Sequence, residues 1–184
     1  KCIWIPNSYT YALNLIYGLI INFDFEVKKA ASIFGWERRI WHSSIDHRGT
    51  ESFPGRVATI VPVVGGVCEG VAYGVAAAKW RDILSYLDDR EKAGYKRKYV
   101  LSDVEGMGSK SVITYVSRPF NKWVSARETD RELINRIVNA RGESGRNIDY
   151  LMRLDRTLVD LEIVDAHIGR LVRSVCQRQI SGEN

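Results

Sequence analysis

The chain has 184 residues, of which 45% are hydrophobic and 27% charged, and its formal net charge is +5. This length suits one domain with a buried core, and the composition is that of an ordinary soluble protein. We therefore expect a single domain over residues 1–184. The positive charge favours anionic partners, but the densest basic run, Lys96-Arg97-Lys98, is too short for a nucleic-acid-binding surface. No nucleic-acid partner is expected.

Cysteine and histidine usage gives no pattern for a metal site. Cys2, Cys68 and Cys176 are far apart in the sequence, and none belongs to a Cys-x-x-Cys pair. Neither a disulfide framework nor a zinc site is predicted, and a reducing compartment such as the cytoplasm fits best. His42 and His47 lie five residues apart with no cysteine nearby, which is a weak pattern for metal ligands. We expect no metal ion.

The first two-thirds of the chain contains the segments expected to form strands. Residues 12–21 (ALNLIYGLII) are apolar but too few to cross a bilayer, so we expect a buried strand or helix there and no membrane partner. Residues 31–42 mix aromatic and β-branched residues, which favours a strand. Residues 56–63 and 67–75 flank a Gly-Gly pair at 65–66, a pattern that predicts a β-hairpin.

The rest of the chain adds a second hairpin and then helices. Residues 98–104 and 111–116 flank a glycine-rich turn and predict that hairpin. Thr129 and Glu132 have the spacing of a capping box, and apolar residues recur at helical spacing from there to residue 175. Strands followed by helices predict an α+β fold. We expect a small mixed or antiparallel β-barrel with flanking helices.

One acidic segment is unusual for its place in the pattern. Residues 83–95 (ILSYLDDREKAGY) put three carboxylates near the end of a predicted helix, where the partial negative charge disfavours them. The apolar face of that helix, which includes Leu84 and Leu87, extends to Glu91. Burial and the helix end would both raise the pKa of the Glu91 carboxyl, which suits it to accept and return a proton near neutral pH.

A simpler interpretation of the same segment remains open. The helix could end at Asp89, which would leave Glu91 in solvent or paired with Arg90 or Lys92. Asp88 and Asp89 are expected to be exposed polar residues.

Five segments together resemble the ChaC-type glutathione-specific γ-glutamylcyclotransferases. Residues 86–95 (YLDDREKAGY) resemble a family signature close to Y-L-x-x-R-E-x-G-G-Y, and residues 41–61 resemble its D-H-R-G-T and P-G-R-V motifs. Residues 65–75 resemble its G-x-C-W-G-V-A-Y strand, 140–154 its G-x-S-G-R/H-N-x-E-Y-L segment, and 165–175 its D-E-H-L region. The segments occur in the family's order.

The resemblance implies an activity, a site and a location. The family is cytoplasmic, folds as a small β-barrel with flanking helices, and converts glutathione to 5-oxoproline and Cys-Gly without a cofactor. Its catalytic glutamate follows the signature arginine, the position that Glu91 occupies here. The substrate's α-amine attacks its own γ-carbonyl, so one carboxyl of intermediate pKa can act as both base and acid. The expected partner is glutathione or a related γ-glutamyl compound, and the chain is expected to be a monomer.

Three other residues are candidates for substrate binding. Tyr95 ends the signature and would position the substrate, with packing in the core as the alternative. Arg48 and Arg56 lie in the D-H-R-G and P-G-R-V motifs, and a guanidinium can bind a substrate carboxylate through two parallel bonds. The alternative for both is a structural ion pair with Asp46 or another acid. Asn147 is expected to cap the helix that follows it.

The resemblance is weakest near the N-terminus. The family has a G-Y-G-S-L-I-W loop whose backbone N–H groups hold the γ-glutamyl part of the substrate. Residues 17–20 (YGLI) keep Tyr17 and Gly18 but lack the first glycine and the serine. Either this is a divergent but working loop, to which Tyr17, Gly18 and Leu19 contribute, or a splice variant or mistaken gene prediction has replaced it. In the second case the protein would be a catalytically impaired binder or regulatory homologue.

Overall fold

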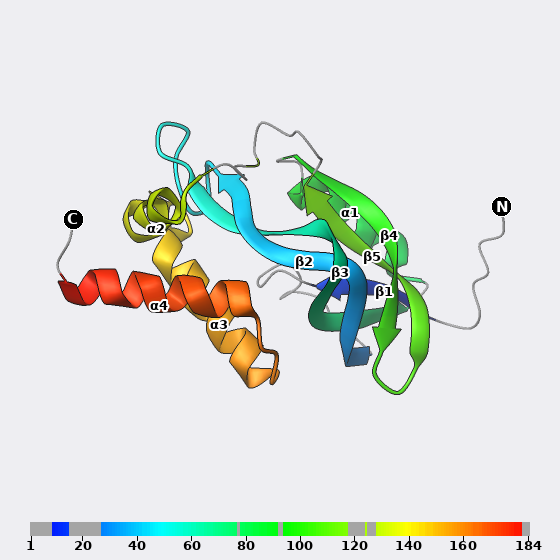
Figure 1. The fold of residues 1–184 in the computed structure, drawn as a ribbon. Coiled ribbons are helices and arrows are strands. Elements are labelled where there is room, and N and C mark those ends of the chain that lie inside the picture. The colour runs from blue at the N-terminus through cyan, green and yellow to red at the C-terminus, as the bar shows by residue number, and fades with distance from the viewer. Residues whose placement is uncertain are drawn as a thin grey trace. The chain divides into compact units, whose positions relative to one another are not determined.

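The computed structural model describes residues 9–14, 27–76, 78–91, 94–117, 124 and 128–181 (Figure 1). These residues belong to two compact units. One is formed by Lys1–Trp36 with Pro62–Val116, and the other by Glu37–Val61 with Ser117–Asn184. The candidate residues Tyr17, Gly18 and Leu19 lie outside the described residues.

The main sheet closes into a barrel, as expected for an α+β fold. Its strands, in the order β1-β3-β2-β4-β5, are β1 Tyr9–Asn14, β3 Gly55–Ala76, β2 Val27–Ser44, β4 Tyr95–Val104 and β5 Gly108–Ser117. The strand β1 pairs antiparallel with β3 and parallel with β5, and the second pairing closes the barrel. The predicted small mixed barrel is therefore confirmed.

One of the two predicted hairpins forms. The strands β4 and β5 are joined by a tight turn, in which the Met107 N–H donates to the Val104 carbonyl at 2.9 Å. Gly106 and Gly108 have φ of 71° and 66°, values that glycine adopts without steric cost.

The hairpin predicted around the Gly-Gly pair at 65–66 is wrong. Residues 56–63 and 67–75 belong to the single strand β3, which is 22 residues long. Gly65 has a φ of 74°, and a residue of positive φ inside a strand produces a local irregularity rather than a reversal of direction. The far end of β3 pairs with β1 instead, from Val71 opposite Asn14 to Ala76 opposite Tyr9.

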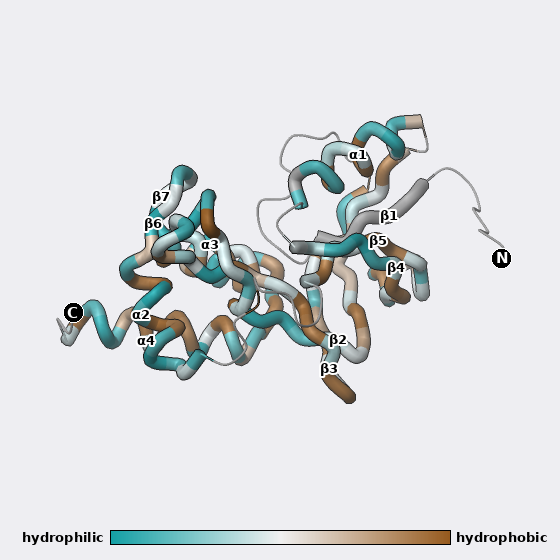
Figure 2. The backbone as a smooth tube through the Cα atoms, turned by 90° about the horizontal axis from the view of Figure 1, so that it is seen from above, coloured by the Kyte–Doolittle hydropathy of each residue, from teal (hydrophilic) through white to brown (hydrophobic). Residues whose placement is uncertain are grey.

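Helix α1 (Trp80–Arg90) packs on the barrel strands through its predicted apolar face. Figure 2 shows the contrast along this helix between hydrophilic turns and hydrophobic positions. The hydrophobic cluster that contains this face comprises Val75, Trp80, Ile83, Leu84, Leu87, Tyr95, Ile113 and Tyr115. Leu87 is 2% exposed, so the side of the last helical turn that points toward the strands is fully buried.

The other unit contains three helices that pack against one another: α2 (Asp130–Asn139), α3 (Asn147–Asp160) and α4 (Ala166–Ser181) (Figure 1). A short hairpin of β6 (Arg141–Gly142) and β7 (Gly145–Arg146) connects α2 to α3. Eight apolar positions at the predicted helical spacing are buried: Leu133, Ile137, Leu151, Leu154, Leu158, Ile168, Leu171 and Val175.

The predicted capping box begins α2. The Glu132 N–H donates to the Thr129 hydroxyl at 3.3 Å, and the Thr129 N–H donates to the Glu132 carboxylate at 2.8 Å. Within the described residues, no helix is long and apolar enough to span a membrane.

Candidate active site

Glu91 lies at the end of α1, as the sequence pattern indicated. The helix runs to Arg90, and Glu91 is its C-cap residue, with a backbone N–H that donates to the Leu87 carbonyl at 3.0 Å. The helix therefore extends beyond Asp89, the earlier end that the simpler interpretation required. The side chain of Glu91 is half-buried. A carboxyl at this place is partly removed from water while it remains accessible to a small solute.

Asp88 links the last turn of α1 to the barrel. The buried Tyr115 hydroxyl on β5 donates to Asp88 Oδ1 at 2.5 Å, and Arg97 Nη1 on β4 donates to Asp88 Oδ2 at 2.8 Å. Asp88 is exposed, as predicted, but local pattern could not predict these two partners, because they lie nine and 27 residues away.

The charge of Glu91 acts on this same tyrosine. Burial raises the pKa of Tyr115 most strongly, the hydrogen bond to Asp88 raises it further, and the charges of Asp88 and Glu91 act in the same direction, while Arg97 opposes them. Tyr115 is therefore held as a neutral hydroxyl near two carboxylates. The end of α1 thus brings together two acids, a buried phenol and an arginine.

Tyr95 begins β4, in the same unit as Glu91. Its half-buried ring packs against the cluster under α1, so core packing accounts for part of this side chain. The preceding residue, Gly94, has a φ of 90°, a left-handed conformation that favours glycine. The Gly-Tyr pair of the signature therefore has a backbone reason for the glycine and a packing reason for the tyrosine.

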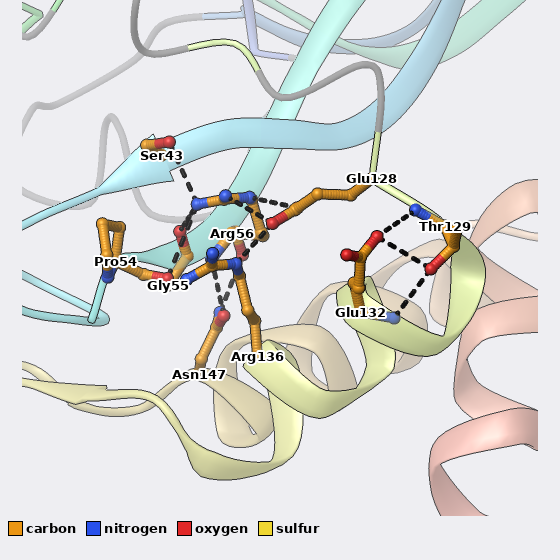
Figure 3. Close-up of polar contacts among 9 residues, drawn as sticks. All are labelled: Ser43, Pro54, Gly55, Arg56, Glu128, Thr129, Glu132, Arg136 and Asn147. Atoms are coloured by element: carbon orange, nitrogen blue, oxygen red, sulfur yellow. Dashed lines mark hydrogen bonds and ion pairs between the residues drawn. The ribbon is translucent and has the colours of Figure 1, made fainter.

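Arg56 is engaged by protein groups on all sides (Figure 3). Its guanidinium forms two parallel bonds with Glu128, from Nε to Oε2 at 2.7 Å and from Nη2 to Oε1 at 2.8 Å. Its Nη1 donates to the Ser43 hydroxyl and to the Gly55 carbonyl, each at 3.0 Å. A second arginine, Arg136, also donates to Glu128. These contacts match the alternative of a structural ion pair, with Glu128 as the acid rather than Asp46.

Asn147 does not cap α3, so that prediction is wrong. Arg146 is the N-cap residue and makes no side-chain cap bond. The fully buried Asn147 side chain instead bonds the backbone of Arg56, accepting from its N–H at 2.6 Å and donating to its carbonyl at 2.7 Å (Figure 3). A neutral amide has both a donor and an acceptor, so it can satisfy the backbone N–H and the backbone carbonyl of one buried residue.

Arg48 holds the loop before β3 against the short hairpin. Its Nη1 donates to the Ser144 carbonyl at 2.6 Å and to the Arg146 carbonyl at 3.4 Å, and its guanidinium lies 5.8 Å from the centre of the Tyr150 ring. Burial is the main cause that lowers the pKa of Arg48. These contacts also favour a structural role.

The same loop is held by its backbone. The Glu143 N–H donates to the Asp46 carbonyl at 2.9 Å, and the His47 N–H donates to the Asp46 carboxylate at 2.5 Å. A Cβ atom on Gly142 would lie 2.1 Å from the Asp46 carbonyl oxygen, so only glycine fits there. Asp46 and His47 therefore hold the turn.

The described candidates fall into two groups. Glu91 and Tyr95 lie together in one unit, whereas Arg48 and Arg56 lie in the other. Among the residues that the structure describes, no three His, Cys, Asp or Glu side chains come together in a way that could hold a metal ion.

Comparison with known proteins identifies the family. The model of the ChaC-like protein family matches residues 14–178, which include the divergent segment at 17–20. The chain belongs to the ChaC-like family. It is 32% identical to γ-glutamylcyclotransferase 2-3 of Arabidopsis thaliana over 86% of this chain and 85% of that protein. It is 30% identical to the human glutathione-specific γ-glutamylcyclotransferase 1, over 86% of this chain and 76% of that protein.

A solved structure confirms the fold of this ChaC-like chain. The crystal structure of a yeast γ-glutamyl cyclotransferase specific to glutathione superposes with a TM-score of 0.82, at 24% identity, over 93% of this chain and 97% of that one.

Proposed function

We propose that this ChaC-like chain is a γ-glutamylcyclotransferase that converts glutathione to 5-oxoproline and Cys-Gly. Family membership and the names of relatives about 30% identical over most of their length support the activity and the substrate. The observation that carries the proposal is the position of Glu91, a half-buried carboxyl at the end of α1 in the segment that matches the family signature.

Glu91 serves as both base and acid in the proposed reaction. Its carboxylate takes a proton from the α-ammonium group of the substrate, and the free amine then attacks the γ-carbonyl carbon. As the tetrahedral intermediate collapses, the bond to Cys-Gly breaks, and protons from the attacking nitrogen reach the leaving nitrogen through Glu91. The attack is intramolecular, so binding the substrate in a folded conformation supplies much of the rate. No metal ion, redox cofactor or covalent enzyme intermediate enters this scheme.

We assign substrate contacts to residues around this carboxyl. Tyr95 begins the strand that follows Glu91, and its ring is only half-buried, so one edge can contact the substrate. Backbone N–H groups at Tyr17, Gly18 and Leu19 are proposed to bind the γ-glutamyl part and to stabilise the oxyanion. Arg48 and Arg56, the two other candidates, are assigned structural roles because their guanidinium groups are engaged by carbonyls and by Glu128.

The cellular setting follows from the same proposal. The chain is proposed to act as a monomer in the cytoplasm, where glutathione is abundant and thiols stay reduced. Within the described residues, Cys176 is a free thiol, which is compatible with that compartment.

A second candidate function is favoured by the altered loop at 17–20. A ChaC-like protein without a working loop would bind γ-glutamyl compounds and release no product. Incubation of the full chain with glutathione, followed by mass spectrometry, separates the two functions. Release of 5-oxoproline supports the enzyme, whereas thermal stabilisation by glutathione with no product supports the binder. Glu91→Gln should abolish release while its thermal unfolding stays near wild type.

A further inference from the structure

The last turn of α1 is fixed to two strands through one side chain. Asp88 accepts the Tyr115 hydroxyl with one carboxylate oxygen and Arg97 with the other, at 2.5 and 2.8 Å. Tyr115 lies near the end of β5 and Arg97 near the start of β4, so the two donors anchor the helix end to different strands. Tyr115 is 8% exposed, so its ring cannot move away without opening the core beneath the helix.

Glu91 lies one helical turn beyond Asp88. The Glu91 N–H bonds the Leu87 carbonyl, so Glu91 is still held to the last helical turn, although the regular helix ends at Arg90. Helical residues three apart are neighbours, with about 5–6 Å between their Cβ atoms. Any movement of the turn that holds Asp88 therefore moves Glu91 as well.

We propose that Asp88, Arg97 and Tyr115 position Glu91 for proton transfer by holding the last turn of α1 against β4 and β5. They are positioning residues, because they act through the helix end rather than on the reacting atoms. The proposal rests on the assignment of Glu91 as the proton-transfer group. A base that must meet a substrate nitrogen loses rate steeply when it is displaced, by up to about a hundredfold for a displacement near 1 Å.

The positioning role also predicts how two substitutions in this cluster change the ionisation of Glu91, which a purely structural role does not. Among the residues whose side chains the structure describes, the charged and titratable groups around this helix end are Asp88, Asp89, Glu91, Tyr95, Arg97 and Tyr115. Asp88→Asn removes a negative charge and leaves Arg97 uncompensated, which favours the ionised form of Glu91. Arg97→Met removes the positive charge and leaves Asp88 uncompensated, which disfavours it. Both variants break the same ion pair, yet they should shift the Glu91 titration in opposite directions.

The direct test is a carbon-13 NMR titration of the full chain with labelled glutamate, at low ionic strength so that screening is weak. Loss of one carboxyl resonance in Glu91→Gln assigns that signal. The expected result is a Glu91 midpoint at lower pH in Asp88→Asn and at higher pH in Arg97→Met. Midpoints that stay fixed, or that move in any other pattern, overturn the proposal. This measurement does not depend on activity.

The positioning role itself is tested by kinetics with glutathione. Asp88→Asn and Tyr115→Phe should each lower kcat by about tenfold to a hundredfold with little change in KM, and the double variant should lose no more than the worse single variant. Asp103→Asn, an exposed carboxylate on β4, serves as the control for charge and should retain wild-type kcat. Additive losses, or losses confined to KM, contradict positioning through a shared contact.

Failure of the proposed function and failure of the positioning role give different results. An active Glu91→Gln variant overturns the proposed function. An inactive Glu91→Gln variant combined with unchanged kcat in Asp88→Asn and Tyr115→Phe overturns only the positioning cluster.

Discussion

Replacement of Glu128 by Gln should show that Arg56 is structural. The Arg56 side chain is 4% exposed and that of Glu128 is 15% exposed, so the ion pair is largely removed from water. Breaking a buried pair by removing one partner costs about 3–5 kcal/mol, because the remaining charge stays buried. In Glu128→Gln the amide keeps only one acceptor oxygen, and its NH₂ group then faces the donors of Arg56 and Arg136. We expect a loss of about 3 kcal/mol in the free energy of unfolding.

Thermal and urea unfolding followed by circular dichroism measure this loss. For a chain of this size, about 3 kcal/mol corresponds to a Tm lower by about 6–12 °C. Glu51→Gln, an exposed carboxylate, is the matched control and should stay within about 0.5 kcal/mol of wild type. Unchanged stability in Glu128→Gln would show that the ion pair between Arg56 and Glu128 does not stabilise the fold. If the KM for glutathione rose at the same time, the role of Arg56 as a substrate carboxylate ligand would be supported instead.

Three further predictions concern two packed positions and one half-buried histidine. Leu87→Ala should lower the free energy of unfolding by about 2–5 kcal/mol in urea, because Leu87 is 2% exposed, whereas Leu101→Ala at a 72% exposed position should have little effect. Gly142→Ala should destabilise the fold by about 1–3 kcal/mol in the same assay, because the new methyl group meets the Asp46 carbonyl. Burial lowers the pKa of His167 to about 4, so the unfolded chain takes up this proton first as the pH falls. Stability should therefore decline from about pH 6.5 toward pH 4, and His167→Gln should flatten that decline in urea titrations at successive pH values.

Local sequence patterns predicted the elements that are determined by residues close together in the sequence. The apolar face of α1 and the capping box at Thr129 both appear where expected, because each depends on residues within one or two helical turns. The β4–β5 turn was equally readable, since its glycines adopt positive φ for steric reasons. These features need no knowledge of the rest of the fold.

The incorrect predictions concern residues whose partners are distant in sequence. The Gly-Gly pair at 65–66 has the composition of a turn, but the strand continues because its far end pairs with β1. Asn147 has the composition of a helix cap, but its side chain bonds the backbone of Arg56, 91 residues away. Tertiary hydrogen bonds override local preference in both places.

Part of the candidate site could be predicted from the sequence and part could not. Glu91 is identifiable because a carboxylate on an apolar helical face at a helix end violates two local rules, as functional residues tend to do. The anchoring of Asp88 by Tyr115 and Arg97 was not readable, because an acid at an exposed helical position looks solvated until β4 and β5 are placed beside it.

The most direct test of the account is release of 5-oxoproline from glutathione by the purified full chain, measured by mass spectrometry beside the Glu91→Gln variant. We expect 5-oxoproline and Cys-Gly in equal amounts from the wild-type chain and none from a folded Glu91→Gln variant. Equal product release by the two proteins, or none from a correctly folded wild-type chain, would contradict the proposed function.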